Sequence, residues 1–174
     1  MLMARADTSA RALLQEFQIN TAPIDPFVLA GSLDVQVVLR DLDDDVSGML
    51  LRRDGRCVIG VNRTHSPLRQ RFTVAHELGH LRIHRGRPLI LDTDTRVNYR
   101  NTVSSMATDR EEIEANRFAA ALLAPEALVR SSVYQTSFRT VGELVTQLGH
   151  TFALSEIAMT YRLMNLGIIS GPPQ

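Results

Sequence analysis

Apolar positions recur at helical spacing along most of the chain, and this pattern predicts a mostly helical protein. A cap at Thr8 or Ser9 starts the first expected helix, and a pair of prolines further along ends it. Further helices are expected over residues 27–31, 66–85, 109–125, 125–131, 140–149 and 155–166. Most of the core is therefore expected to come from helices.

Strand-like segments are few and lie in the N-terminal half of the chain. Residues 35–39 are rich in β-branched side chains and predict one strand. Residues 49–53 and 56–61 flank Asp54-Gly55, a dipeptide typical of a two-residue hairpin turn between antiparallel strands. The predicted fold class is thus α+β, mostly helical, with a small antiparallel sheet.

One long segment carries neither pattern. Residues 87–108 are rich in Asp, Thr, Asn and Ser, and a loop of this length is uncommon unless it is functional or disordered. Two interpretations of this loop stay open. It is either a lid or substrate-binding edge over a functional site, or a disordered stretch.

Length and composition fit a single globular domain. The chain has 174 residues, of which 44% are hydrophobic and 22% are charged, enough to bury a core of its own. Within this one domain, residues 1–174, we expect a helical N-terminal part over about 1–34. The sheet and two long helices are expected over about 35–125, and C-terminal helices over about 126–174.

The charge balance excludes several classes of function. The formal net charge is zero, and Arg162 is the single basic residue of the expected helix over 155–166, so direct nucleic-acid binding is not expected. All 19 basic residues are arginines. This excludes chemistry that needs a phosphate-binding or Schiff-base lysine.

The sequence predicts a cytoplasmic protein without a membrane segment. Cys57 is the single cysteine, so no internal disulfide can form and a reducing compartment is favoured. The N-terminal residues carry arginines and acids but lack the apolar core of a signal peptide. The longest apolar stretch, residues 118–124, is too short to span a bilayer.

The most informative segment is the expected helix over 66–85, which contains His-Glu-Leu-Gly-His at positions 76–80. His76 and His80 are four residues apart, about 40° around a helix axis, so both imidazoles face the same way. This spacing lets two ring nitrogens bind one Zn²⁺. Glu77 lies beside the first histidine on a different face, where it is suited to be a general base rather than a ligand.

A catalytic zinc site needs a third protein ligand and an open fourth position. The nearest further histidine, His84, continues the four-residue spacing but lies about 80° from His76 around the helix axis. We therefore expect His84 to support the site or to pack beside it. Zn²⁺ is the expected metal, and Mn²⁺ or Fe²⁺ are alternatives for a site of two histidines and a carboxylate.

The better candidates for the third ligand are three acids, Glu111, Glu112 and Glu114, at the start of the expected helix over 109–125. Glu112 shares a stripe with small residues that allow a close approach to the histidine helix. Glu111 and Glu114 fall on other faces and suit the positive end of the helix dipole. Asn116, one turn after Glu112, is placed to orient a ligating imidazole through its second ring nitrogen.

Three segments of the chain share their order and spacing with a known family. They are Phe72-Thr-Val-Ala-His-Glu-Leu-Gly-His80, Glu112-Ile-Glu-Ala-Asn-Arg-Phe-Ala-Ala-Ala-Leu-Leu-Ala-Pro125 and the C-terminal stretch 154–169. Together they resemble the ImmA/IrrE family of zinc metallopeptidases, and the resemblance extends from about residue 45 onward.

This resemblance implies a zincin-like metallopeptidase fold in which the helix that carries HELGH is the active-site helix. It implies a thermolysin-like (gluzincin) site, with His76, His80 and Glu112 as zinc ligands and Glu77 as the general base. In such a site the base takes a proton from water and delivers it to the leaving amine.

The resemblance also implies a biological role. Members of the family typically cleave a helix-turn-helix transcriptional repressor and so activate genes of mobile elements, phages or stress responses. The sequence therefore predicts a zinc-dependent endopeptidase whose protein substrate is a repressor encoded nearby.

Two other functions compete with this interpretation. One is a module that binds its partner without cutting it, such as an antirepressor or half of a toxin–antitoxin pair. Glu77 favours catalysis over this alternative, because binding alone does not need a base. The other is hydrolysis of a small amide or a peptidoglycan-like substrate, which is disfavoured because no export signal is recognised.

The sequence does not identify the residue that stabilises the oxyanion. Tyr99, in the long expected loop, is the first candidate, and His150, Tyr161 and Arg162 are the others. For substrate binding, the edge of the hairpin at 58–61 is expected to pair with an extended peptide.

Overall fold

The computed structural model describes residues 2–84, 89–93 and 102–172. In chain order its elements are α1 (Leu2–Glu16), α2 (Pro26–Ser32), β1 (Val35–Arg40), β2 (Val46–Arg53), β3 (Arg56–Asn62), α3 (Pro67–Ile83), β4 (Leu89–Thr93), α4 (Thr102–Leu123), α5 (Glu126–Gln135), α6 (Val141–Phe152) and α7 (Glu156–Asn165). The predicted α+β, mostly helical class is confirmed. None of the helices in the described part of the chain combines the length and hydropathy that a membrane span requires.

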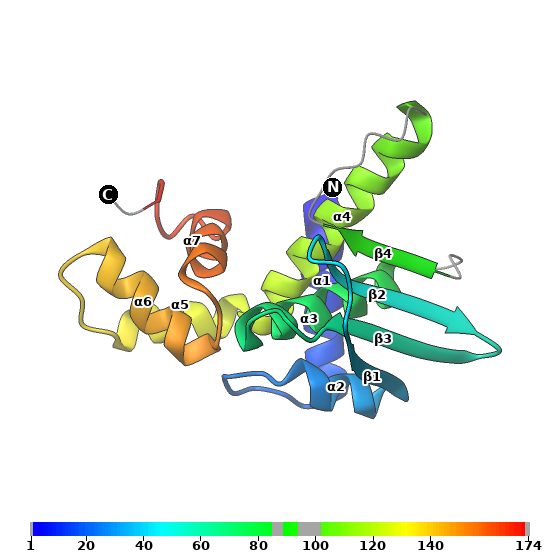
Figure 1. Ribbon diagram of the computed structural model, residues 1–174. Helices are drawn as coiled ribbons and strands as arrows, with labels where there is room; N and C mark the ends of the chain where they lie inside the picture. The colour runs from blue at the N-terminus through cyan, green and yellow to red at the C-terminus, as the bar shows by residue number, and fades with distance from the viewer. Residues whose placement is uncertain (1, 85–88, 94–101, 173–174) are drawn as a thin grey trace.

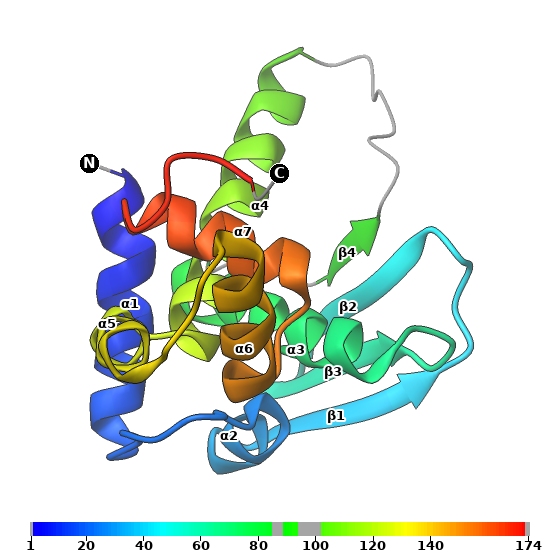
Figure 2. The same ribbon diagram turned by 90° about the vertical axis from the view of Figure 1, so that its left-hand side faces the viewer.

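Helices α3 and α4 lie between the sheet and the C-terminal helices. Figure 1 shows the sheet on one side of the molecule and α5, α6 and α7 on the other. Between them α3 and α4 pack directly against each other, and α1 covers α4 (Figure 2). Because α3 also packs on β2 and β3, its residues from Thr73 to His80 are all buried.

The β2–β3 hairpin predicted from Asp54-Gly55 is confirmed. The two strands pair antiparallel, with Arg53 opposite Arg56. Asp54 and Gly55 have positive φ angles of 51° and 73°. This is the conformation of the two-residue turn that matches the natural twist of paired strands.

The sheet is mixed rather than purely antiparallel. Its order is β1-β3-β2-β4, and β1 runs parallel to β3, with Val37 opposite Ile59. β3 lies between β1 and β2. It is antiparallel to β2, its partner in the hairpin, and parallel to β1. The predicted substrate-binding edge at 58–61 is therefore wrong, because both sides of β3 are occupied by neighbouring strands.

The first helix begins earlier than its predicted cap. Thr8 and Ser9 lie inside α1. Ala6, Ala10 and Leu13 are fully buried and form one stripe on α1. Because α1 packs on α4, the helix continues through Thr8 and Ser9. Capping preference and helix propensity are weak signals that such packing overrides.

The predicted loop over 87–108 is wrong where the structure describes it. β4 occupies residues 89–93 and pairs antiparallel with β2, and α4 already begins at Thr102. The apolar run of β4 is too short to predict a strand by itself, and pairing with β2 is what forms it. Residues 85–88 and 94–101 lie outside the described residues, so whether that part is a lid stays a prediction.

Helix α3 is anchored at both ends. Ser66 Oγ accepts a hydrogen bond from the first turn, and Pro67 occupies the first helical position, as the sequence predicts. At the other end, the Arg52 guanidinium from β2 donates to the carbonyl oxygens of His80 (2.8 Å) and His84 (3.0 Å). A cation there also complements the negative end of the helix dipole.

Gly48 of β2 allows α3 to approach the sheet closely. A Cβ atom there would overlap Thr73 Cγ2 and lie 3.1 Å from the Gly60 carbonyl oxygen and 3.3 Å from Glu77 Oε1. We therefore expect Gly48→Ala to lower the free energy of unfolding by about 1–3 kcal/mol, the typical cost of overpacking. Urea denaturation measures this, with Gly31→Ala as the control because its Cβ would meet no atom within 4 Å. Equal stability of the two variants would contradict the close approach.

Candidate metal centre

Two ring nitrogens converge on one face of α3. His76 and His80 are both buried, and their Nε2 atoms lie 3.0 Å apart. The four-residue spacing on a helix produces this convergence, because it brings both rings to the same face.

Glu112 of α4 joins the two histidines. Its Oε2 lies 3.1 Å from His76 Nε2, and its Oε1 lies 3.2 Å from His80 Nε2. Among the described residues, this is the group of three or more potential ligands compact enough to hold a metal ion, with all ligand atoms within 4.8 Å of one another. The Glu112 side chain is 29% exposed, so the cluster is open to solvent on this side.

Small residues bring α4 close enough to α3 for this contact. A Cβ atom on Gly79 would lie 3.2 Å from Ala115 Cα and 3.1 Å from Phe118 Cδ1. Ala115 and Ala119, small residues on the same stripe of α4 as Glu112, are fully buried. The close approach between the two helices is therefore as predicted.

The charge states of the cluster suit a metal ion. Burial alone raises the pKa of Glu112, but the contacts of its carboxylate with the His76 and His80 rings outweigh this effect and lower the pKa to about 2. Burial lowers the pKa of His80, although Glu112 opposes this effect. Near neutral pH, Glu112 is thus an anion and His80 is neutral, the forms in which these side chains bind metals.

Glu77 lies next to the cluster without being part of it. It follows His76 on α3 and is fully buried. Its carboxylate lies near β2, where Gly48 has no side chain to crowd it. The structure therefore buries a second carboxylate on the helix that carries His76 and His80, outside the cluster of candidate ligands.

Asn116 supports His76 from the side away from the cluster. Its Oδ1 lies 3.0 Å from His76 Nδ1. Because an amide oxygen only accepts hydrogen bonds, this contact places the proton of His76 on Nδ1 and leaves a lone pair on Nε2. This is the contact that the sequence predicts for Asn116.

The comparison with protein families agrees with this geometry. Residues 30–164 match the family described as the IrrE N-terminal-like domain, Peptidase_M78. The chain belongs to this family. The match includes the HELGH segment and Glu112, and it confirms the resemblance drawn from the sequence.

Two further proteins are similar to this member of the IrrE N-terminal-like family. One is "Uncharacterized immunity region protein 2" of Bacillus phage phi105, 26% identical over 158 residues that cover 86% of this chain and 92% of the relative. The other is a solved structure described as a Mycobacterium tuberculosis transcriptional regulator, with a TM-score of 0.61 and 20% identity over 92% of this chain. The chain spans 47% of that regulator, and this likeness shows the fold alone.

His84 and Glu114 form a buried pair behind His80. The expectation that Glu114 serves the helix dipole is wrong, because α4 begins at Thr102 and Glu114 lies in mid-helix, 5% exposed. Its Oε2 lies 2.9 Å from His84 Nε2, and His84 Nδ1 lies 3.1 Å from His80 Nδ1. One feature of the sequence could have indicated the contact between His84 and His80: His84 follows His80 by four residues, the same spacing as between His76 and His80.

The oxyanion candidates have different outcomes in this IrrE-like domain. Tyr99 lies outside the described residues. His150 on α6 and Tyr161 on α7 are exposed, and their role in stabilising the oxyanion stays a prediction. Arg162 is wrong as a candidate, because its side chain is buried and bonded elsewhere.

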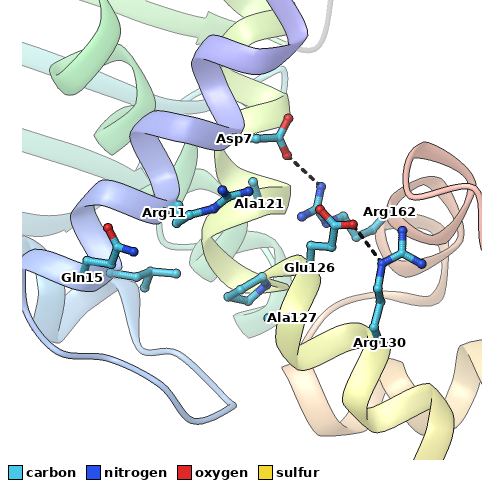
Figure 3. Close-up of a pocket in the computed structure, with 10 residues that line it drawn as sticks. Asp7, Arg11, Gln15, Ala121, Glu126, Ala127, Arg130 and Arg162 are labelled. Carbon is cyan, nitrogen blue, oxygen red and sulfur yellow. Dashed lines mark hydrogen bonds and ion pairs between the residues drawn. The ribbon is translucent and has the colours of Figure 1, made fainter.

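Arg162 joins α7 to the N-terminal part of the fold. Its Nε donates to the Ala124 carbonyl oxygen at 2.9 Å, and its Nη1 pairs with Asp7 Oδ1 at 3.2 Å. Asp7 also accepts from Arg117 Nε at 2.6 Å. A pocket of about 460 Å³ is lined here by residues of α1, α4, α5 and α7. Asp7 and Arg162 are among these residues (Figure 3).

Proposed function

We propose that this protein is a zinc-dependent endopeptidase. The observation that carries the proposal is the convergence of His76, His80 and Glu112, with Glu77 buried beside them on the same helix. Membership of the IrrE N-terminal-like peptidase family supports a hydrolytic role for this cluster.

The converging side chains would hold the ion through two imidazole nitrogens and one carboxylate. This donor set fits Zn²⁺, and it is the set that catalytic zinc sites use when one coordination position stays open. The exposed side of Glu112 leaves room for a substrate to reach the cluster. When bound there, Zn²⁺ supplies Lewis-acid chemistry that polarises a scissile carbonyl and makes water more acidic.

Glu77 is the general base of the proposed reaction. Its carboxylate accepts a proton from the attacking water as the water oxygen bonds to the carbonyl carbon of the peptide. When the C–N bond breaks, Glu77 delivers this proton to the leaving amine. Burial on α3 holds the carboxylate in place next to His76, so little reorganisation accompanies each proton transfer.

The proposed substrate is a helix-turn-helix transcriptional repressor encoded near this protein. Support comes from the phage relative, which is described as an immunity region protein, and from the structural neighbour, which is described as a transcriptional regulator. Cleavage would relieve repression of phage, mobile-element or stress genes. A cytoplasmic site of action follows from such a partner, and the reaction needs no direct contact with nucleic acid.

Incubating the purified, Zn²⁺-loaded protein with the neighbouring repressor tests this proposal. The expected result is one discrete cut, located by mass spectrometry of the fragments, that disappears when a chelator removes the metal. Bound zinc with tight repressor binding and no cut would instead support a binding module, such as an antirepressor or a toxin–antitoxin partner. Absence of both zinc and repressor binding would contradict both functions.

Removing the Glu112 carboxylate should abolish the stabilisation of the protein by zinc. Zn²⁺ at about 100 times its Kd should raise the free energy of unfolding by about 2.7 kcal/mol, because it binds the folded state. Glu112→Ala lacks one of three ligands and should show almost none of this gain.

Thermal unfolding with and without Zn²⁺ measures this difference. Glu111→Ala removes a neighbouring carboxylate that is not part of the cluster, and it should keep the full zinc-dependent shift. If Glu112→Ala is stabilised as much as the wild type, Glu112 is not a ligand.

A further inference from the structure

We infer that His84 and Glu114 are positioning residues that hold the candidate ligand His80 in one tautomer and one orientation; this inference rests on the proposed metal centre. The three side chains form a continuous line of contacts. His80 Nδ1 lies 3.1 Å from His84 Nδ1, and His84 Nε2 lies 2.9 Å from Glu114 Oε2. All three residues are buried, so solvent does not compete with these contacts.

The protons along this line can be assigned, because each contact needs one donor and one acceptor. His80 turns its Nε2 toward Glu112 and the cluster, and as a ligand it must keep a lone pair there. Its proton therefore resides on Nδ1 and is donated to His84 Nδ1. Since His84 accepts at that nitrogen, its own proton resides on Nε2 and is donated to Glu114.

Glu114 gives the line a charged end. Its Oε2 receives the bond from His84, whereas its buried Oε1 has no hydrogen-bond partner among the described residues. The Arg5 guanidinium lies 4.0 Å from Oε2 and is largely exposed. A carboxylate behind a ligating imidazole fixes the ring and raises its basicity. Here that effect reaches His80 through His84.

The backbone at His84 is held by contacts that do not involve the cluster. The His84 N–H donates to the His80 carbonyl oxygen at 3.0 Å and ends α3. Arg52 of β2 binds the carbonyl oxygens of both residues, and Arg5 of α1 donates to the Ile83 carbonyl oxygen at 2.9 Å. These contacts place the His84 ring behind His80 independently of any metal.

The two histidine ligands are therefore supported in different ways. His76 contacts the neutral amide of Asn116, which is exposed. His80 has an imidazole and a buried carboxylate behind it. Loss of the His84–Glu114 pair should weaken the metal site through His80 and leave the support of His76 intact.

The metal affinity of two variants tests the inference. His84→Phe fills a similar volume but cannot accept a hydrogen bond, and we expect its Zn²⁺ affinity at fixed pH to fall about 10–100-fold. Glu114→Gln keeps an acceptor for His84 but removes the charge, and we expect a smaller loss. Competition with a chromophoric chelator measures the affinity. His150→Phe, at an exposed position on α6, is the matched control and should bind like the wild type.

Two spectroscopic measurements separate positioning from a general structural defect. The d–d absorption spectrum of the Co²⁺-loaded protein should change in His84→Phe, because the orientation of His80 changes. In the Zn²⁺-loaded wild type, ¹⁵N NMR of the imidazoles should find His80 protonated at Nδ1 and His84 protonated at Nε2. The NMR experiment needs no substitution, so it decides the matter even if a variant fails to fold.

Several outcomes would overturn the inference. Protonation of His84 at Nδ1 would do so, as would wild-type Zn²⁺ affinity and an unchanged Co²⁺ spectrum in His84→Phe. In both cases the wild type binds metal, and the proposed peptidase function stands. A wild-type protein that binds neither Zn²⁺ nor Co²⁺ would overturn the proposed function and this inference together.

Discussion

Replacing Glu77 by Gln should slow cleavage of the repressor by about 10²–10⁴-fold, the usual contribution of a general base, and leave the metal content unchanged. Glutamine has nearly the shape of glutamate, so the fully buried side chain still fits between α3 and β2. Its amide cannot take up the proton of the attacking water. The candidate ligands His76, His80 and Glu112 are untouched by this change.

The value of kcat/KM for repressor cleavage, with metal analysis of the same preparation, measures this effect. Glu111→Gln makes the same chemical change on α4 outside the cluster, and it should cut at the wild-type rate. Full activity of Glu77→Gln would assign the base to another residue. Loss of metal along with activity would show that Glu77 helps to hold the ion.

Removing the Asp7 carboxylate should lower the free energy of unfolding by about 3–5 kcal/mol, the cost of leaving a buried charge without its partner. The Arg162 side chain is 2% exposed, and Asp7 Oδ1 lies 3.2 Å from its Nη1. Burial lowers the pKa of Arg162, and Asp7 opposes this effect. Asp7→Ala removes that compensation and also deprives Arg117 of its partner. Helix α7 should therefore separate from α1 at lower denaturant concentration.

Chemical denaturation followed by circular dichroism measures this loss. Glu16→Ala breaks the more exposed pair between Glu16 and Arg82, whose atoms are 2.8 Å apart, and should cost less than about 1 kcal/mol. Arg162→Leu combined with Asp7→Ala should recover much of the stability, because the buried charge is gone. If Asp7→Ala costs no more than Glu16→Ala, the buried pair does not hold these helices together.

The parts of the fold that neighbouring residues specify could be predicted from the sequence. Asp54-Gly55 adopts the positive φ angles of a hairpin turn because these two residue types tolerate them. Ser66-Pro67 starts α3 because a hydroxyl and a ring with fixed φ satisfy the first turn of a helix. Each of these signals acts over only a few residues.

The parts of the fold that distant segments specify could not be predicted in this way. β4 forms because it pairs with β2, and β1 is parallel to β3 because the hairpin inserts beside it. α1 extends across Thr8 and Ser9 because Ala6 and Ala10 continue the buried stripe. These outcomes depend on surface buried between elements, which no local pattern records.

The same division applies to the candidate site. Helix periodicity is enough to predict that His76 and His80 face one way and that Glu77 does not join them, because it fixes the direction of each side chain. The contact of Glu114 with His84 and the burial of Arg162 against Asp7 depend instead on how the helices pack together. Those contacts join residues 30 and 155 positions apart, and they exist because packing of whole helices brings each buried charge to a partner.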